Sequence, residues 1–415
     1  MGTVDEGAAP RRDDGTIDLN GLARELLEGV VNAVMDEQAA ELCGDGNSRN
    51  GYRERGLDTS VGRIVPRIPR LREGTYFPDD VVERWSGTDT ALAGATCEMW
   101  VNGVSNRKVD RIASELGVTS MSRSRVSRMC ASLDGQVAEL RGCDLSATTW
   151  PYPWLDATYA PCREAGAARS EAVVTAVAAS SDGVRHVVGI ACVDTESYVS
   201  WRGFLPSLRA RGLAGVRLVV PDAHEGLVRA MREVLVGATR QRCITHLERN
   251  VADRCRRRGD GAAAAAAPRA AFGESDPALV RAGYERAAEL LVRVDPAGAD
   301  LPADAEADAL AYLDFPRRHR VWVRTNNVRE RMDAEIKRRT RVVQVFPSVD
   351  SLVRLVGAVC CEQNDEWAVA TSFIDRRSLG DPTSGHDAHV EPEPGELARV
   401  LRLVGEAFDG KRRAA

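Results

Sequence analysis

The stretch PYPWLDATYAPC (residues 151–162) decides how the rest of the chain is interpreted. Its centre, WLDATY, combines aromatic, branched and apolar residues, a composition typical of a β-strand. One acid, Asp156, interrupts it. A carboxylate on a buried strand is costly unless it is paired or binds a metal ion, and a residue in the middle of a strand caps no helix. Asp156 is therefore the first candidate functional residue, with a hydrogen-bonded structural acid as the alternative.

Strands and helices alternate after this stretch. EAVVTAVAAS and RHVVGIACV predict two further strands, joined by a Ser-Asp-Gly turn signal at residues 181–183. A helix is expected at residues 200–211, a buried strand at GVRLVVPD, a helix at DAHEGLVRAMREVL and a fifth strand at RQRCITH. This pattern predicts an α/β fold with a mixed sheet that opens with a three-strand meander. In such a sheet the first and fourth strands can be neighbours.

Two other acids have simpler local explanations. Asp222 ends the fourth predicted strand, and Glu225 three residues later completes a capping-box pattern. Glu330 has the same relation to Asn327. Ligands of open α/β sheets nevertheless bind at the carboxyl ends of strands, where Asp222 would lie. Three converging carboxylates would suit Mg²⁺ or Mn²⁺, and two such ions can clamp the attacking and leaving oxygens of a phosphoryl transfer.

Composition limits the class of protein. The chain has 415 residues, which predicts two to four domains, and no run of eighteen apolar residues. The N-terminus does not look like a signal peptide, and ten scattered cysteines favour a reducing cytoplasm over secretion. The net charge is −5, yet residues 47–72 carry seven arginines against two acids, and residues 105–128 carry six basic residues against two acids. Such basic faces suit a nucleic-acid partner.

The N-terminal part is predicted to be mainly helical. A disordered leader is expected over residues 1–20 and an amphipathic helix over residues 22–42, followed by short arginine-rich strands and turns. Residues 105–130 have the layout of a helix-turn-helix, with Ser122 or Ser124 as the N-cap of the second helix. Two packed helices with a solvated basic face are the alternative. The candidate DNA contacts here are Arg107, Lys108, Arg123, Arg125 and Arg128.

The C-terminal half reads as an interrupted domain. Residues 251–317 are Ala- and Arg-rich and predict an all-helical insertion. A charged helix over residues 327–341 and an amphipathic helix that packs back on the sheet would complete the domain. Residues 376–415 are expected to form a flexible tail. Further candidate phosphate contacts follow Glu330: Lys337, Arg338, Arg339 and Arg341.

A series of phrases then points to a family. In order they are RNGYRER, RIPRLREGTYFP, SRSRVSRMC, YPWLDATY, DAHEGL, QRCITHLERN, RTNNVRERMDAEIKRRTRVVQVFPS and RLVGAVCCEQNDEWAV. Over residues 47–370 the chain resembles the bacterial Mutator-type insertion-sequence transposases, which have an RNase H-like core and a DDE triad of acids. The resemblance implies that Asp156, Asp222 and Glu330 are the catalytic, metal-binding triad. It also implies two Mg²⁺ or Mn²⁺ ions as cofactors, and a helix-turn-helix in the N-terminal region.

Other residues near these motifs are weaker candidates. Cys243 and His246 match a Cys-x-x-His element of the family, for which a structural zinc site is the less favoured role because no second ligand pair has the right spacing. His224 would lie beside Asp222, and Asn327 and Asp333 beside Glu330. Asp333 stands where the family often has Asn. Trp201 is expected in the core, with base stacking as the alternative.

The sequence therefore predicts a DNA transposase that binds the terminal inverted repeats of its element and catalyses metal-dependent strand cleavage and strand transfer. The expected parts are an N-terminal DNA-binding region (21–145), a catalytic core in two segments (150–250 and 318–375), the insertion and the tail. Double-stranded DNA would be the partner of a dimer or larger assembly, in the cytoplasm, with no membrane. A non-catalytic DNA-binding repressor and an RNase H-like nuclease are the alternatives.

Overall fold

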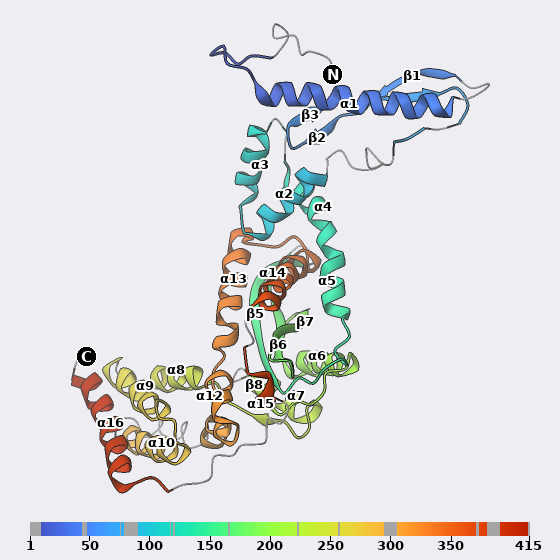
Figure 1. The fold of residues 1–415 in the computed structure, drawn as a ribbon. Helices are drawn as coiled ribbons and strands as arrows, with labels where there is room; N and C mark the ends of the chain where they lie inside the picture. Colours follow the sequence, from blue (N-terminus) through green and yellow to red (C-terminus); the bar gives the residue numbers. More distant parts are fainter. Residues whose placement is uncertain are drawn as a thin grey trace. The chain divides into compact units, whose positions relative to one another are not determined.

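The computed structural model describes residues 10–43, 48–74, 76–78, 90–116, 118, 121–164, 167–221, 224–255, 258–293, 305–370, 373–379 and 391–413 (Figure 1). The chain divides into two compact units, Met1–Asp134 and Gly135–Ala415. All ten cysteines are free thiols. No helix within the described ranges is long and apolar enough to cross a membrane.

The first unit combines one long helix, short strands and a group of shorter helices. Its elements are α1 (Leu19–Leu42), β1 (Arg49–Glu54), β2 (Leu57–Thr59), β3 (Gly62–Ile64), β4 (Arg67–Leu71), α2 (Thr90–Val101), α3 (Asn106–Glu115), α4 (Arg123–Met129) and the 3-10 turn η1 (Cys130–Ser132). β1 pairs with β4 and β2 with β3, both antiparallel. The short arginine-rich strands expected from the sequence are therefore present.

Helix α1 packs on the strands through only part of its apolar residues, among them Leu27, which packs against Leu57 and Ile64. Met35 and Ala39 are fully buried, whereas the apolar residues Leu26 and Val30 are 53% and 60% exposed. Polar side chains of α1 hold the strand backbone: Asn32 Oδ1 accepts the Arg67 N–H at 2.8 Å. Part of this packing therefore depends on side-chain hydrogen bonds, which hydrophobic periodicity does not indicate.

The second unit is built around a five-stranded mixed sheet in the order β7-β6-β5-β8-β9. The strands are β5 (Tyr152–Glu164), β6 (Ala167–Ala179), β7 (Arg185–Val193), β8 (Leu218–Pro221) and β9 (Thr239–Arg240). The first three form an antiparallel meander, and β8 and β9 run parallel to β5. The expected meander and the adjacency of the first and fourth strands are confirmed. The fifth strand is shorter than expected, because Cys243 already serves as the N-cap of a helix.

Helices cover both faces of this sheet. Helices α6 (Tyr198–Ala210) and α7 (Glu225–Val234) share a hydrophobic cluster with Leu155 of β5 and with the inward residues of β6. Helices α13 (Asn327–Val343) and α14 (Val349–Val369) lie on the other face, as Figure 1 shows. Helix α5 (Leu133–Gly142) approaches α14 closely: a Cβ at Gly357 would lie 2.5 Å from Val137 Cγ1, so glycine is required there. The sequence prediction that residues 348–370 pack back on the sheet is confirmed.

A helical group follows the sheet's last strand. It contains α8 (Ile244–Arg254), α9 (Arg258–Phe272), α10 (Pro277–Val292) and, from the end of the chain, α16 (Pro394–Arg413). A short helix at residues 305–309, the 3-10 turn η2 (Ala311–Asp314) and α12 (Arg317–Val323) lead back to the sheet. Figure 1 shows α16 against α9 and α10.

The C-terminal residues differ from the expected flexible tail. Their described part forms α15 (Arg376–Leu379) and the 20-residue α16. Val400, Val404 and Phe408 of α16 are buried, at most 2% exposed. This face of α16 covers the alanine-rich surface of α9, whose small side chains let the helices approach closely.

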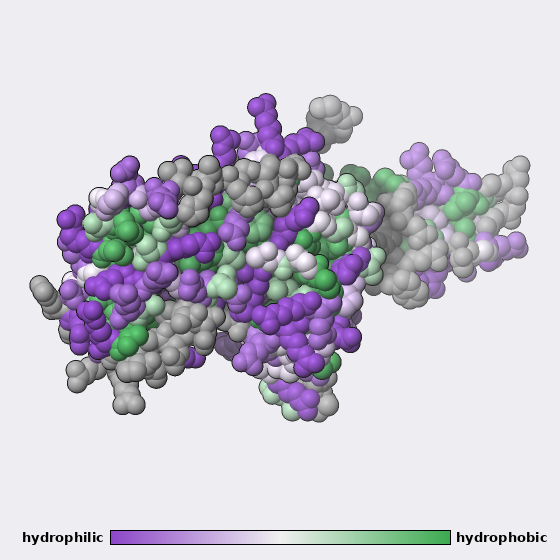
Figure 2. Space-filling view, turned by 90° about the horizontal axis from the view of Figure 1, so that it is seen from below, coloured by the Kyte–Doolittle hydropathy of each residue, from purple (hydrophilic) through white to green (hydrophobic). Residues whose placement is uncertain are grey.

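The side of the molecule seen in Figure 2 is mainly hydrophilic, with small separate hydrophobic patches.

Candidate active site

Asp156 lies on the sheet face that α13 covers. Alternation along β5 turns Leu155 toward α6 and α7, and Asp156 toward the opposite side. The carboxylate is 18% exposed. Its Oδ1 accepts the backbone N–H of Ala157 at 2.8 Å. Asp156 is therefore held by a hydrogen bond to the backbone of β5, while part of its carboxylate faces solvent.

A buried arginine reaches Asp156 from α13. Arg329 is fully buried, and its Nη2 lies 3.6 Å from Asp156 Oδ2. The same nitrogen donates to Asp333 Oδ1 at 2.8 Å and to Thr175 Oγ1 at 2.6 Å. Thr175 is the strand partner of Asp156 on β6. The structure thus brings Asp156 and Asp333 together around one guanidinium.

Burial and the Arg329 guanidinium shift the pKa of Asp333 in opposite directions. Burial, helped by the neighbouring carboxylate of Asp156, raises the pKa of Asp333 to about 6 against the lowering effect of Arg329. Burial alone would lower the pKa of Arg329, but Asp333 and Asp156 outweigh it and raise that pKa. Arg329 therefore stays charged next to two acids. Asp333 itself is only 8% exposed, so it does not lie on a solvated face of α13.

Asp222 falls outside the described residues. Its neighbour Pro221 ends β8 and pairs in register with Leu155, the residue before Asp156. Helix α7 starts at Glu225 with His224 as its N-cap residue. The capping-box prediction for Asp222 and Glu225 therefore concerns a residue outside the described ranges. The imidazole of His224 lies 3.8 Å from Glu196 Oε1.

Glu330 lacks the capping role that its sequence spacing to Asn327 indicated. Helix α13 has Asn326, not Asn327, as its N-cap residue, and the Asn326 side chain makes no capping hydrogen bond. Glu330 and Asn327 are both exposed. Within the described part of the chain Glu330 has no hydrogen bond or ion pair. A carboxylate that is exposed and uncommitted next to Arg329 is available to a ligand.

The turn that starts α13 is held from two sides. Trp154 Nε1 of β5 donates to the carbonyl of Thr325 at 3.2 Å. From the α8 side, the Ile244 N–H donates to the Arg324 carbonyl at 3.1 Å, and Cys243 Sγ accepts the Asn326 N–H at 3.3 Å. These bonds fix the beginning of the helix that carries Glu330.

Cys243 and His246 form a hydrogen-bonded pair beside this turn. Burial alone would raise the pKa of the Cys243 thiol, but its hydrogen bonds to His246 and to the Asn326 backbone outweigh burial and lower it. Asn326 is 3% exposed, and neither polar atom of its side chain has a hydrogen-bond partner among the described residues. The Cys-x-x-His element therefore joins α8 to α13.

Trp201 belongs to the core. It is fully buried in the cluster beneath α6 and α7, and its Nε1 donates to Glu196 Oε1 at 3.1 Å. The expected core role is confirmed for Trp201, and its burial excludes base stacking in this conformation.

The side chains at this site are of the type that binds a divalent ion. Asp156 and Glu330 offer carboxylate oxygens, which Mg²⁺ and Mn²⁺ prefer. In the described ranges, no three His, Cys, Asp or Glu side chains are grouped as metal ligands would be. Among the described residues, Asp156 forms its ion pair with the fully buried guanidinium of Arg329.

The candidate DNA contacts of the first unit divide into exposed and internal residues. Arg107, Lys108, Arg123 and Arg128 are exposed. Arg125 instead forms an ion pair with Asp58 of β2, which is only 4% exposed. The helices themselves are present as expected, with Ser122 accepting the Arg125 N–H as the N-cap of α4 at 3.3 Å. Arg125 thus ties α4 to β2.

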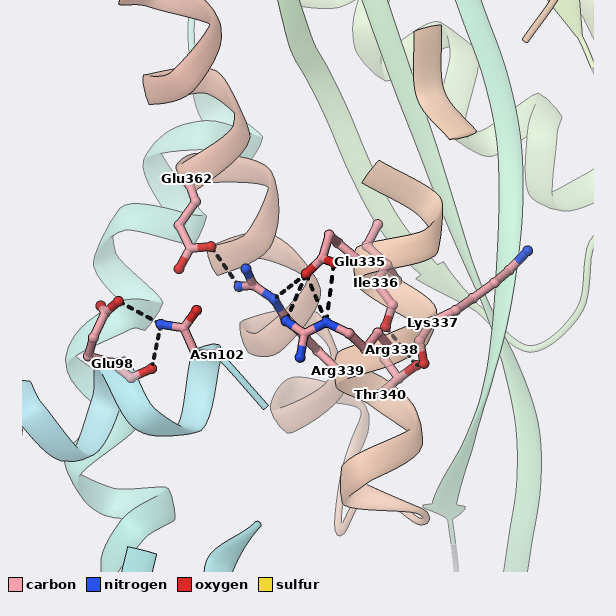
Figure 3. Close-up of polar contacts among 9 residues, drawn as sticks. All are labelled: Glu98, Asn102, Glu335, Ile336, Lys337, Arg338, Arg339, Thr340 and Glu362. Atoms are coloured by element: carbon pink, nitrogen blue, oxygen red, sulfur yellow. Dashed lines mark hydrogen bonds and ion pairs between the residues drawn. The ribbon is translucent and has the colours of Figure 1, made fainter. Parts of the chain in front are cut away.

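The basic residues of α13 divide in the same way. Arg339 is buried and pairs with Glu335 at 3.3 Å and with Glu362 of α14 at 2.6 Å. Arg338 is exposed and pairs with Glu335 at 2.8 Å. Figure 3 shows Lys337 extending away from these ion pairs. Lys337 and Arg341 are exposed, which leaves Arg339 as the member of this group with an internal role.

Comparison with known proteins identifies the family. The sequence profile of the family "Transposase, Mutator family" matches residues 4–370. The chain belongs to the Mutator family of transposases. It is 37% identical over 405 residues to the transposase for insertion sequence element IS1081 of Mycobacterium tuberculosis, covering 92% of this chain and 94% of the relative.

Other transposases of the family are similar over most of their length. The transposase for IS406 of Burkholderia multivorans is 36% identical over 369 residues, covering 86% of this chain and 94% of the relative. The transposase for IS256 in transposon Tn4001 of Staphylococcus aureus is 32% identical over 358 residues, covering 83% of this chain and 91% of the relative.

In this Mutator-family chain, sequence reasoning missed Arg329 and Asn326. Arg329 precedes Glu330 in a run of charged residues, RERMDAEIKRR, and reads as one more solvated base. A signal was present, because Arg329 and Asp333 are four residues apart and therefore share one face of a helix. The sequence does not distinguish the buried Asn326 from the neighbouring asparagine, Asn327.

Proposed function

We propose that this transposase cuts and joins DNA at a site formed by Asp156, Asp222 and Glu330. The observation that carries the proposal is the position of Asp156. Its carboxylate is fixed on a central strand, partly exposed, next to the strand that ends directly before Asp222. Helix α13, with the exposed Glu330, lies against the same strand.

The strand order supports an RNase H-like core. Numbered from β5, the sheet has the order 3-2-1-4-5, with the second strand antiparallel to its neighbours and the last two parallel to the first. In this arrangement the carboxyl end of β8, Pro221, lies beside Leu155 of β5, the residue before Asp156. Acids at these two places can serve one ligand.

The chain's own residues would supply binding and orientation. Asp156, Asp222 and Glu330 would hold two Mg²⁺ or Mn²⁺ ions, which when bound supply Lewis-acid activation of water and of the scissile phosphodiester. No serine or tyrosine nucleophile is needed, since water and then the freed 3′-hydroxyl attack phosphorus directly. The exposed Lys337, Arg338 and Arg341 of α13 would contact the DNA phosphates.

DNA end recognition is assigned to the first unit. The helices α3 and α4 would act as a helix-turn-helix, with Arg107, Lys108, Arg123 and Arg128 as phosphate or base contacts. We leave Arg125 and Arg339 out of the proposed DNA-contact set, because both are engaged in internal ion pairs. Bringing two element ends together implies at least a dimer on DNA.

A strand-transfer assay tests the proposal. The substrate is double-stranded DNA that carries the repeats bracketing the coding sequence, with Mg²⁺ present. Joining of ends to a target supports the transposase, nicking without joining supports a nuclease, and binding alone supports a repressor. The Asp156→Asn variant should bind the DNA and lose both reactions. The control variant Asp314→Asn alters an exposed acid paired with Arg281 and should retain them.

A further inference from the structure

Arg329 is a fully buried charged side chain directly beside the candidate catalytic acid. It is among the largest side chains of the protein with less than 2% exposure. It precedes Glu330 on the first turns of α13. Taking a guanidinium out of water is costly unless its environment supplies charge and hydrogen bonds.

The environment of Arg329 comes from three elements. The Arg329 Nη2 donates hydrogen bonds to Thr175 Oγ1 of β6 at 2.6 Å and to Asp333 Oδ1 of α13 at 2.8 Å. The same nitrogen lies 3.6 Å from Asp156 Oδ2 of β5. Thr175 and Asp156 are direct strand partners, so the guanidinium lies over one cross-strand pair. Arg329 therefore connects the strand of the first acid to the helix of the third.

This arrangement is not the one that stability alone would favour. Arg329 Nε is buried without a hydrogen-bond partner among the described residues. Replacing a buried ion pair by apolar groups of similar volume is often neutral or stabilising. The carboxylates of Asp156 and Asp333 flank a single positive charge, so removing the guanidinium alone would leave them unscreened from each other.

We propose that Arg329 is a positioning residue: its guanidinium orients the Asp156 carboxylate and balances its charge, and Asp333 holds Arg329 in place. This inference rests on the proposed function of Asp156. It gives Asp333 a supporting role through Arg329 and leaves ligand binding to Asp156, Asp222 and Glu330. The Arg329–Asp333 pair can therefore be removed by substitution while the three acids of the triad are kept.

The separability defines the experiment, which uses the full chain and four variants. Arg329→Met removes the charge but keeps a long side chain, and the double variant Arg329→Met/Asp333→Asn removes both members of the pair. Arg339→Met is the matched control, since Arg339 is a second buried arginine on α13 whose ion pairs are with Glu335 and Glu362. Asp156→Asn is run in parallel. The measurements are thermal unfolding, Mn²⁺ binding by the DNA-free protein followed by electron paramagnetic resonance, and DNA end cleavage across Mn²⁺ concentrations.

The double variant should unfold near the wild-type temperature, even where Arg329→Met alone is too unstable to measure. Its Mn²⁺ affinity and its cleavage should both fall by about 10- to 100-fold, the usual effect of losing a group that orients a metal ligand. Arg339→Met should change unfolding and leave the Mn²⁺ dependence of cleavage at the wild-type value.

Two outcomes would overturn the inference. Wild-type Mn²⁺ binding and cleavage in the double variant would mean that Arg329 only neutralises Asp333. An equal shift in Mn²⁺ dependence for Arg339→Met would mean that any lesion in α13 has this effect. If Asp156→Asn itself cuts DNA normally, the proposed function fails, a result distinct from normal cleavage by the double variant beside an inactive Asp156→Asn.

Discussion

At the scale of single residues, the acids of the candidate site differ in whether their carboxylates form ion pairs within the protein. Asp333 is buried against Arg329, whereas Glu330, three residues earlier, is exposed and has no partner in the described ranges. Both acids lie on the same helix, α13. Their environments, rather than their residue type, decide which of them can turn toward a ligand.

Replacing Glu330 by Gln should therefore abolish cleavage without affecting folding. An exposed side chain without contacts contributes within about 0.5 kcal/mol to stability, so the unfolding transition should not move. Glu335→Gln is the control on the same helix: its carboxylate pairs with Arg338 and Arg339, and its loss should lower the unfolding temperature slightly and leave cleavage intact. Thermal unfolding and end cleavage, measured on both variants, check this. Cleavage by Glu330→Gln at the wild-type rate would remove Glu330 from the triad.

The sequence predicted the acid on β5 because a mid-strand Asp has no local use. It could not predict the burial of Arg329, since burial depends on where α13 docks against β5 and β6. For the same reason it left Asp222 and Glu330 open to a capping interpretation. Which residue serves as N-cap depends on where a helix starts, and sequence patterns locate such boundaries least well.

At the scale of elements, the joint between α8 and α13 explains the Cys-x-x-His element. The thiol of Cys243 accepts the N–H of Asn326, the N-cap residue of α13, and His246 is hydrogen-bonded to that thiol. The sequence left a structural zinc site as the less favoured role of this element. The observed contacts instead give Cys243 and His246 a role in holding the start of α13.

Cys243→Ala should weaken this joint. The Asn326 N–H would lose its acceptor in a buried position, at a cost of about 1–3 kcal/mol, and cleavage should fall because the start of α13 is no longer fixed. Cys243→Ser, which keeps an acceptor, should recover much of both properties. Cys255→Ala at the other end of α8 is the control and should cleave normally. Denaturant unfolding and end cleavage provide the measurements. Equal effects at positions 243 and 255 would contradict the assignment.

A second joint links β5, α12 and α15 through His319. Tyr152 O–H donates to His319 Nδ1 at 2.7 Å, and His319 Nε2–H donates to Ser378 Oγ at 2.8 Å, while the Ser378 hydroxyl donates to the Asp375 carbonyl at 2.7 Å. This chain of donors requires a neutral imidazole. Burial lowers the pKa of His319 to about 4 from 6.5.

This shift predicts a loss of stability in mild acid. The unfolded chain binds a proton at His319 below about pH 6.5 and the folded chain only below about pH 4, so stability falls as pH decreases through this window, by about 3 kcal/mol in full. The His319→Asn variant should be less stable at pH 7 but should lack this contribution to the slope. Urea unfolding at a series of pH values between about 6.5 and 4.5 measures it. Parallel slopes for the two proteins would contradict a neutral buried His319.

At the scale of the whole molecule, the sequence predicted the order of parts better than their limits. The sheet meander, the adjacency of the first and fourth strands, the helical stretch after the sheet and the return of α14 to the sheet were all legible from local patterns. The role of residues 394–413 was not, because the apolar face of α16 has meaning only against the small residues of α9 and α10. Long-range pairing of this kind leaves no local signature.

The central claim is that the carboxylate of Asp156 holds a divalent ion for DNA cleavage. Its most direct test is metal rescue of the Asp156→Cys variant, with Asp314→Cys as the control, measured as end cleavage in Mg²⁺ and in Mn²⁺. A thiolate is a poor ligand for Mg²⁺ and a better one for the softer Mn²⁺. We expect Asp156→Cys to be inactive in Mg²⁺ and to regain cleavage in Mn²⁺, while the control cleaves in both. Cleavage by Asp156→Cys in Mg²⁺ at the wild-type rate would contradict the account.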